Sequence, residues 1–227
     1  IPVIDWNSVS FPGYGTEEGK SFNVWEKFFE QPCGISPEEA YALNDCFEID
    51  KLSEFPNYSV IDYEKLADAG EPETVRICEL YKKYVRLRKD LAADFETQKK
   101  KLFGRRKKVI GILCRGTDYT CLKPPFHSIV PAAENMISET EELIKKYAPD
   151  GIFLVTEDRR IFAKFMRKFG KLVITADADR FGDTGNQILN QLNEKNDQYN
   201  KDLNYLMQIY ILSKLDCQLI SPGTGGA

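Results

Sequence analysis

The chain has 227 residues, of which 42% are hydrophobic, so it can bury a large core and form one or two domains. Its formal net charge of -4 at pH 7 gives no overall attraction to nucleic acid, so we expect no nucleic-acid partner. The six cysteines are scattered without CxxC spacing, which favours buried free thiols and a reducing compartment.

The hydropathy of the chain bears on whether the protein enters a membrane, and the residues at its two ends bear on whether the sequence is complete. We find no signal peptide and no apolar run of transmembrane length, so we expect no integral membrane segment. The chain opens in IPVIDW and ends in SPGTGGA, which leaves open whether either terminus is complete.

The first hundred or so residues carry few chemical signals. Residues 1–6 alternate as a strand would, and the glycines and proline that follow predict a loop. Trp25, Phe28 and Phe29 have helical spacing, which favours core packing over the alternative of a sugar-binding cleft. Ser36 before Pro37 predicts the start of a short helix.

A long helical pattern precedes the second half of the chain. Apolar residues recur at helical spacing from Val75 to Leu102, with no proline or glycine before Gly104, and predict one helix of about thirty residues. Acidic residues interleave with its many lysines and arginines, which favours a solvated face over a nucleic-acid site. We place a domain boundary after this helix, with residues 1–107 in the first domain and residues 108–227 in the second.

The second half alternates strands and helices. Strands are expected at 109–113, 151–156, 171–175 and 216–220, and helices at 131–147, 159–169 and 203–214. This alternation predicts an α/β fold with a doubly wound parallel sheet.

Polar or glycine-rich residues follow three of the expected strands, and in a parallel sheet these ends lie at one edge. The three groups are Arg115, Gly116, Thr117, Asp118 and Tyr119; Thr156, Glu157 and Asp158; and Ser221 through Gly226. Small residues with backbone amides beside a hydroxyl and an arginine suit a diphosphate. Neither GxGxxG nor GxxxxGK[ST] is present, which argues against a standard dinucleotide or P-loop site.

The runs CRGTDY, LKPPFHSIVP, LVTEDRRIFAKF and YLMQIYILSKLDCQLISPGTGG are similar to the peptide motifs of the fucosyltransferase superfamily. That superfamily contains α1,6- and α1,2-fucosyltransferases and protein O-fucosyltransferases, and the likeness is greatest to bacterial nodulation-type and polysaccharide-type members. It covers residues 108–227, and FNVWEKFFEQPCGIS resembles the upstream half of the bacterial members.

The resemblance implies a GT-B fold of two Rossmann-like domains, the first for the acceptor and the second for the donor. It implies an inverting, metal-independent transfer of fucose from GDP-fucose to a glycan acceptor, with no cofactor. A bacterial cytoplasmic location follows from the same likeness, with peripheral contact to the inner membrane and the oligomeric state left open.

Individual roles carry over from the motifs to matching positions. The motif arginine that holds the donor β-phosphate falls on Arg115, and the acidic pair near ribose and base falls on Glu157 and Asp158. Thr224 and Gly225 fall where the family faces the phosphates. Gln208 stands where the family has an acid that reads guanine, and Leu113 and Gly116 stand where the α1,6-enzymes have a histidine and a second arginine.

The expected catalytic residues are Arg115, which would stabilise charge on the leaving diphosphate, and Asp118, with Glu157 as the alternative base. His127 is either an exposed loop residue or a contact to donor or acceptor. The expected donor-binding residues are Arg115, Gly116, Thr117, His127, Glu157, Asp158, Gln208, Ser221, Thr224 and Gly225. We expect no metal site, because Asp177, Asp179 and Asp183 lack the glycine and closing glutamate of a calcium loop.

Two other classes of function remain open. A non-catalytic protein that binds sugar nucleotides or glycans is favoured by Gln208 and Leu113. A different doubly wound enzyme, such as a hydrolase or dehydrogenase, is disfavoured by the absence of GxSxG and GxGxxG.

Overall fold

The computed structural model describes residues 2–10, 13–43, 45, 48, 72–116, 130–182 and 198–221. The chain divides into two compact units, Ile1–Ala92 and Ala93–Ala227. We refer to them as the first unit and the sheet unit.

The described part of the first unit contains short helices rather than a sheet. Its elements are η1 (Ser8–Ser10), α1 (Trp25–Phe28), α2 (Pro37–Tyr41) and α4 (Pro72–Tyr84). Trp25 and Phe28 are 4% and 5% exposed, so core packing is the correct interpretation for these two rings. The strand predicted at residues 1–6 is wrong, because residues 2–6 have no regular structure and only Asn7 forms an isolated bridge, to Asn23.

Helix α2 begins as its sequence predicts. The Ser36 hydroxyl accepts a hydrogen bond from the Glu39 amide at 3.2 Å, and the Glu39 carboxylate accepts from the Ser36 amide at 2.7 Å. With Pro37 as the first helical residue, this reciprocal pair is a capping box.

The single long helix predicted from Val75 to Leu102 is two helices, α4 and α5 (Lys89–Phe103). The intervening residues are extended and pair with the end of α1: the Glu30 amide donates to the Arg86 carbonyl at 2.8 Å, and the Arg88 amide donates to the Phe28 carbonyl at 3.0 Å. Tertiary hydrogen bonds therefore override a helical pattern that contains no proline or glycine.

Most of helix α5 belongs to the sheet unit, whereas the sequence-based boundary lies at residue 107. The reason is its apolar face. Phe95 is 1% exposed and packs against Tyr210, and Phe103 packs against Phe153.

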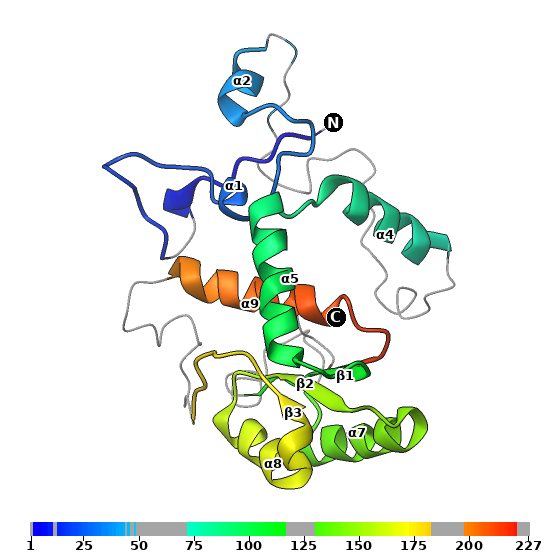
Figure 1. The fold of residues 1–227 in the computed structure, drawn as a ribbon. Helices are drawn as coiled ribbons and strands as arrows, with labels where there is room; N and C mark the ends of the chain where they lie inside the picture. Colours follow the sequence, from blue (N-terminus) through cyan, green and yellow to red (C-terminus); the bar gives the residue numbers. More distant parts are fainter. Residues whose placement is uncertain are drawn as a thin grey trace. The chain divides into compact units, whose positions relative to one another are not determined.

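The sheet unit is built on parallel strands, as predicted (Figure 1). The described strands are β1 (Val109–Leu113), β2 (Gly151–Val155), β3 (Val173–Ile174) and β4 (Gln218–Ile220), in the order β3-β2-β1-β4. The helices are α5, α7 (Ala133–Tyr147), α8 (Arg159–Phe169) and α9 (Gln198–Leu212), with η3 (Gly170–Leu172) before β3. The α/β class and the parallel sheet are therefore confirmed for this part of the chain.

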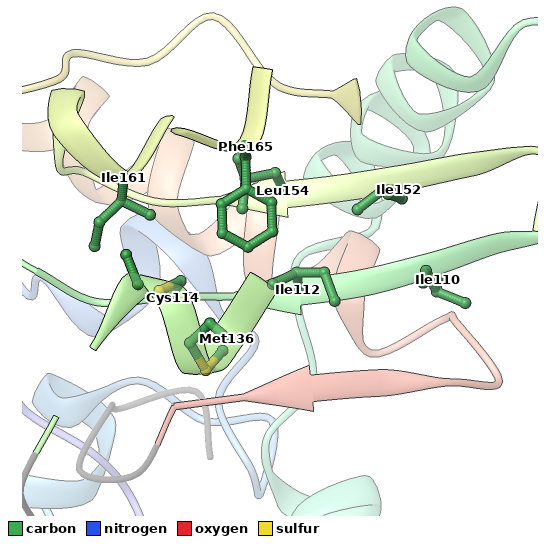
Figure 2. Close-up of a cluster of buried hydrophobic side chains, with 9 residues drawn as sticks. Ile110, Ile112, Cys114, Met136, Ile152, Leu154, Ile161 and Phe165 are labelled. Atoms are coloured by element: carbon green, nitrogen blue, oxygen red, sulfur yellow. The ribbon is translucent and has the colours of Figure 1, made fainter. Parts of the chain in front are cut away.

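The side chains of β1 and β2 alternate between two apolar layers, because successive strand residues point to opposite faces. One layer packs against α7 and α8; it contains Ile110, Ile112, Cys114, Met136, Ile152, Leu154, Ile161 and Phe165 (Figure 2). The other packs against α5 and α9; it contains Leu113, Phe153, Val155, Ile174, Ile211 and Leu212. Helices thus cover both faces of the sheet (Figure 1).

The cysteines are only partly as predicted. The four in the described residues are free thiols, but Cys114 alone is buried, Cys33 and Cys217 are half-buried and Cys78 is exposed. Within the described residues, no helix is both long and apolar enough to cross a membrane.

Candidate functional site

The strand order reverses direction at β1. The chain moves from β1 to β2 and then to β3 on one side, and α9 returns it to β4 on the other side of β1. Helices α7 and α8 pack on one face and α9 on the opposite face, so the carboxyl ends of β1 and β4 flank a topological switch point. Open α/β sheets bind their ligands in the crevice at such a point.

Arg115 lies at this switch point, two residues after the end of β1. Its amide donates to the Ser221 hydroxyl at 3.1 Å, and the Ser221 amide donates to the Leu113 carbonyl at 2.9 Å. Ser221 is fully buried. The ends of β1 and β4 are therefore tied together at the position of the predicted arginine.

Glu157 lies beside Arg115, at the end of β2. Leu113 is in register with Val155, so Arg115 and Glu157 are equivalent positions two residues further along. The Glu157 carboxylate oxygen Oε1 accepts a hydrogen bond from the Gly116 amide at 2.8 Å and lies 3.9 Å from Arg115 Nε. The Arg115 and Glu157 side chains are 23% and 21% exposed, so this contact is only partly screened by water.

Position 116 has no room for a side chain, so a glycine is required there. A Cβ atom at this position would meet Asp158 Cβ and Oδ2, both at 2.6 Å, and Ile161 Cδ1 at 2.8 Å. The turn after β1 thus packs directly on the start of α8, and a side chain would separate them.

Three of the amides predicted to cradle a diphosphate lie in the described residues and have protein acceptors. In the described residues, the amides of Arg115, Gly116 and Ser221 donate to Ser221 Oγ, Glu157 Oε1 and the Leu113 carbonyl. These bonds fix the turn, and the cationic group that the turn presents is the Arg115 guanidinium.

Asp158 forms the N-terminus of α8. Its Oδ1 accepts from the amides of Arg160 at 2.7 Å and Ile161 at 3.2 Å, and its Oδ2 pairs with the Arg160 guanidinium at 3.0 Å. Asp158 is 2% exposed, and its amide donates to the Thr156 hydroxyl at 3.2 Å. Its carboxylate therefore holds the helix start, and its contact with a donor stays a prediction.

The segment after β3 runs beside the end of β2, which the sequence did not indicate. The Phe181 amide donates to the Glu157 carbonyl and the Arg159 amide donates to the Phe181 carbonyl, both at 2.8 Å. Arg180 anchors this segment, with its guanidinium bonded to Thr175 Oγ1 and the Ala176 carbonyl and lying 4.2 Å from the centre of the Phe162 ring. No motif marks Arg180, because its partners are mostly backbone carbonyls.

Cys114 directly precedes Arg115 in the chain, and its side chain lies in the apolar layer covered by α7 and α8 (Figure 2). Burial, which is the larger cause, and the nearby Glu157 and Asp158 carboxylates together raise the pKa of its thiol to about 12. The residue acts as a small apolar group and not as a thiolate nucleophile.

Gln208 lies on α9, where it is 6% exposed. Its amide nitrogen donates to the carbonyl and Oδ1 of Asn204, both at 3.3 Å, and the Asn204 side chain donates to the Asp177 carbonyl at 2.7 Å. Asn204 thus links α9 to the segment after β3, and Gln208 bonds to Asn204 within the helix. The contact of Gln208 with a donor base stays a prediction.

The structure brings together five of the predicted residues, which we call the carboxyl-edge site: Arg115, Gly116, Glu157, Asp158 and Ser221. The remaining predicted positions, except Gln208, lie outside the described residues: Thr117, Asp118, His127, Thr224 and Gly225. Asp183 also lies outside them, and Asp177 and Asp179 are exposed. Over the parts of the chain that the structure describes, no group of three or more potential metal ligands gathers.

A separate cavity of about 800 Å³ lies beside β3. It is lined by residues of α5, α9 and the end of β3, with Phe95, Leu102 and Met207 among its apolar residues and Asp94 and Asn204 among its polar ones. The carboxyl-edge residues do not line it, so the two features are distinct.

Comparison of the sequence with models of known protein families and with curated proteins gives no match.

Proposed function

We propose that the sheet unit binds a nucleoside-diphosphate sugar at the carboxyl-edge site. The observation that carries this proposal is the position of Arg115, which lies at the topological switch point and is fixed there by Ser221 and Glu157. A guanidinium presents several N–H donors in one plane, which suits the oxygens of a diphosphate. The resemblance of the surrounding motifs supports GDP-fucose as the donor and a two-domain GT-B arrangement.

The reaction that follows is an inverting transfer of fucose to a glycan hydroxyl. The bond between fucose C1 and the β-phosphate oxygen breaks with its electron pair going to GDP, and the acceptor oxygen forms a new bond to C1 from the opposite face. The acceptor proton passes to a base, for which Asp118 and Glu157 are the two candidates.

Arg115 would act on the leaving group in this reaction. Negative charge grows on the β-phosphate as the C1–O bond breaks, so a fixed guanidinium stabilises the transition state more than the bound donor. Because its backbone is held by a partly buried hydrogen bond and its Nε faces Glu157, Arg115 would need little reorganisation at that step.

The test is a binding panel of GDP, UDP, CMP and GDP-fucose, measured by thermal shift and calorimetry. We expect GDP and GDP-fucose to stabilise the wild type, and Arg115→Ala to weaken their binding by roughly tenfold or more, as for the loss of a charge-assisted hydrogen bond. Arg105→Ala is the matched control, because Arg105 is an exposed arginine in the turn after α5. The proposal fails if no nucleotide binds the wild type, or if Arg115→Ala binds as the wild type does.

Transfer is tested separately, by release of GDP from GDP-fucose in the presence of glycan acceptors. Binding of GDP-fucose without any release would favour the second candidate, a non-catalytic protein that binds sugar nucleotides. That candidate is supported by Gln208, which carries a carboxamide where the resembling family has a carboxylate and whose amide nitrogen donates to Asn204.

A further inference from the structure

Glu157 is held in place by an interruption of the sheet. The Cys114 amide donates to the Val155 carbonyl at 3.0 Å, as a parallel ladder requires. Two residues further, the Glu157 carbonyl accepts instead from the Phe181 amide at 2.8 Å. The backbone of β2 has therefore turned from β1 towards the segment after β3.

The Glu157 side chain provides the Gly116 amide with an acceptor in place of the Glu157 carbonyl. The Gly116 amide, which continuation of the ladder would direct to the Glu157 carbonyl, donates to Glu157 Oε1 at 2.8 Å. The same oxygen lies 3.9 Å from Arg115 Nε. One carboxylate oxygen thus accepts a hydrogen bond from the turn that carries Arg115 and lies within ion-pair distance of the guanidinium itself.

We propose that Glu157 is a positioning residue for Arg115, which holds the arginine in the orientation that binds the diphosphate. This inference rests on the proposed function of the carboxyl-edge site. It differs from the role that the resemblance implies, in which Glu157 lies near the ribose and base of the donor.

Electrostatics favours this indirect role. A carboxylate facing a diphosphate directly would repel it, whereas a carboxylate on the Nε side of an arginine orients the guanidinium plane. The Arg115 side chain is long and flexible, and fixing it before the ligand arrives lowers the entropy lost on binding.

The test compares GDP with 2′,3′-dideoxy-GDP, which keeps the diphosphate and lacks both ribose hydroxyls. If Glu157 acts through Arg115, Glu157→Ala weakens both ligands by the same factor, roughly tenfold. Glu157→Gln recovers only part of the affinity, because the carboxamide oxygen still accepts from the Gly116 amide but no longer carries the charge that faces Arg115 Nε. Glu141→Ala is the matched control: Glu141 on α7 pairs with Lys168 at 2.6 Å, away from this sheet edge, and its loss leaves both affinities unchanged.

A second comparison asks whether the effect depends on the guanidinium. In an Arg115→Lys background the ammonium has no plane to orient, so the loss caused by Glu157→Ala shrinks to about threefold or less. Calorimetry on the folded fraction measures the affinity for GDP separately from the stability of each variant. If Glu157→Ala folds poorly, the same comparison is made with Glu157→Gln.

The outcomes separate the two proposals. If the wild type binds neither ligand, the proposed function fails, and this inference fails with it. If the wild type binds GDP but Glu157→Ala affects GDP alone, Glu157 contacts the ribose and the positioning role is wrong. The role is also wrong if Glu157→Ala leaves both affinities unchanged, or costs the same factor in the Arg115→Lys background.

Discussion

Gly116 packs so closely on Asp158 that a Cβ atom at residue 116 would lie 2.6 Å from the Asp158 Cβ. We therefore expect Gly116→Ala to lower the free energy of unfolding by about 1–3 kcal/mol, as for overpacking of a tight contact. Gly182→Ala is the control, because a Cβ there meets no atom within 4 Å, and its effect should stay within about 0.5 kcal/mol. Urea denaturation of both variants measures the difference, and equal stabilities would contradict the packing described.

Asp158 supports the start of α8 through two backbone amides and Arg160. Replacing it with alanine removes these acceptors, and we expect a loss of about 2 kcal/mol in the free energy of unfolding. Asp158→Asn keeps one acceptor oxygen and should cost less. Glu134→Ala breaks an exposed pair with Lys164 and should cost under about 0.5 kcal/mol. If Asp158→Ala is as stable as Glu134→Ala, the carboxylate does not support the helix.

The Cys114 thiol should resist alkylation in the folded protein. Burial and the nearby carboxylates raise its pKa to about 12, so at pH 8 almost no thiolate is present, and the side chain is fully buried. Iodoacetamide should label the exposed Cys78 first and reach Cys114 only after unfolding. Mass spectrometry of the peptides resolves the two sites, and labelling of Cys114 at the rate of Cys78 would contradict its burial.

Asp150 should make stability depend on pH. Its carboxylate accepts from the amides of Lys107 and Lys108 at 2.8 and 2.9 Å, and these hydrogen bonds, that of Lys107 foremost, lower its pKa. A lowered pKa in the folded state adds stability above the unfolded value of about 3.9, and this stability is lost as the pH falls through the folded pKa.

Asp150→Asn should therefore be less stable than the wild type at pH 7, with the difference shrinking as the pH is lowered towards and below the folded pKa. Asp179→Asn, which changes an exposed carboxylate after β3, provides the control for the general effect of charge. Urea denaturation across this pH range gives the comparison. A difference between wild type and Asp150→Asn that is constant with pH would show that these hydrogen bonds do not depend on the charge.

The sheet unit follows its sequence closely because local pattern and tertiary packing agree there. The run Val109–Leu113 is the strand β1, and the helix predicted from Arg159 to Phe169, closed by Gly170, is α8. For the same reason the sequence predicts correctly that Arg115 and Ser221 lie at one edge of the sheet, since the carboxyl ends of parallel strands lie together.

The features that the sequence did not predict depend on contacts between residues far apart in the chain, which no local pattern encodes. The break before Lys89 exists because Arg86 and Arg88 pair with the end of α1. The hydrogen bond from Gly116 to Glu157 exists because Phe181 draws the β2 backbone away from β1. The sequence predicts that Glu157 lies at the site. The hydrogen bond that its carboxylate accepts from the Gly116 amide is seen only in the structure.

The position of β4 has a consequence for how the protein folds. Strands β1, β2 and β3 are neighbours in both sequence and sheet, so they can assemble through relatively local contacts, whereas β4 must close a long loop before it pairs with β1. The bond from Arg115 to Ser221 spans 106 residues and belongs to that last closure. A state of the chain in which β4 is unpaired would lack half of the crevice, so the capacity to bind a ligand requires that β4 has paired with β1.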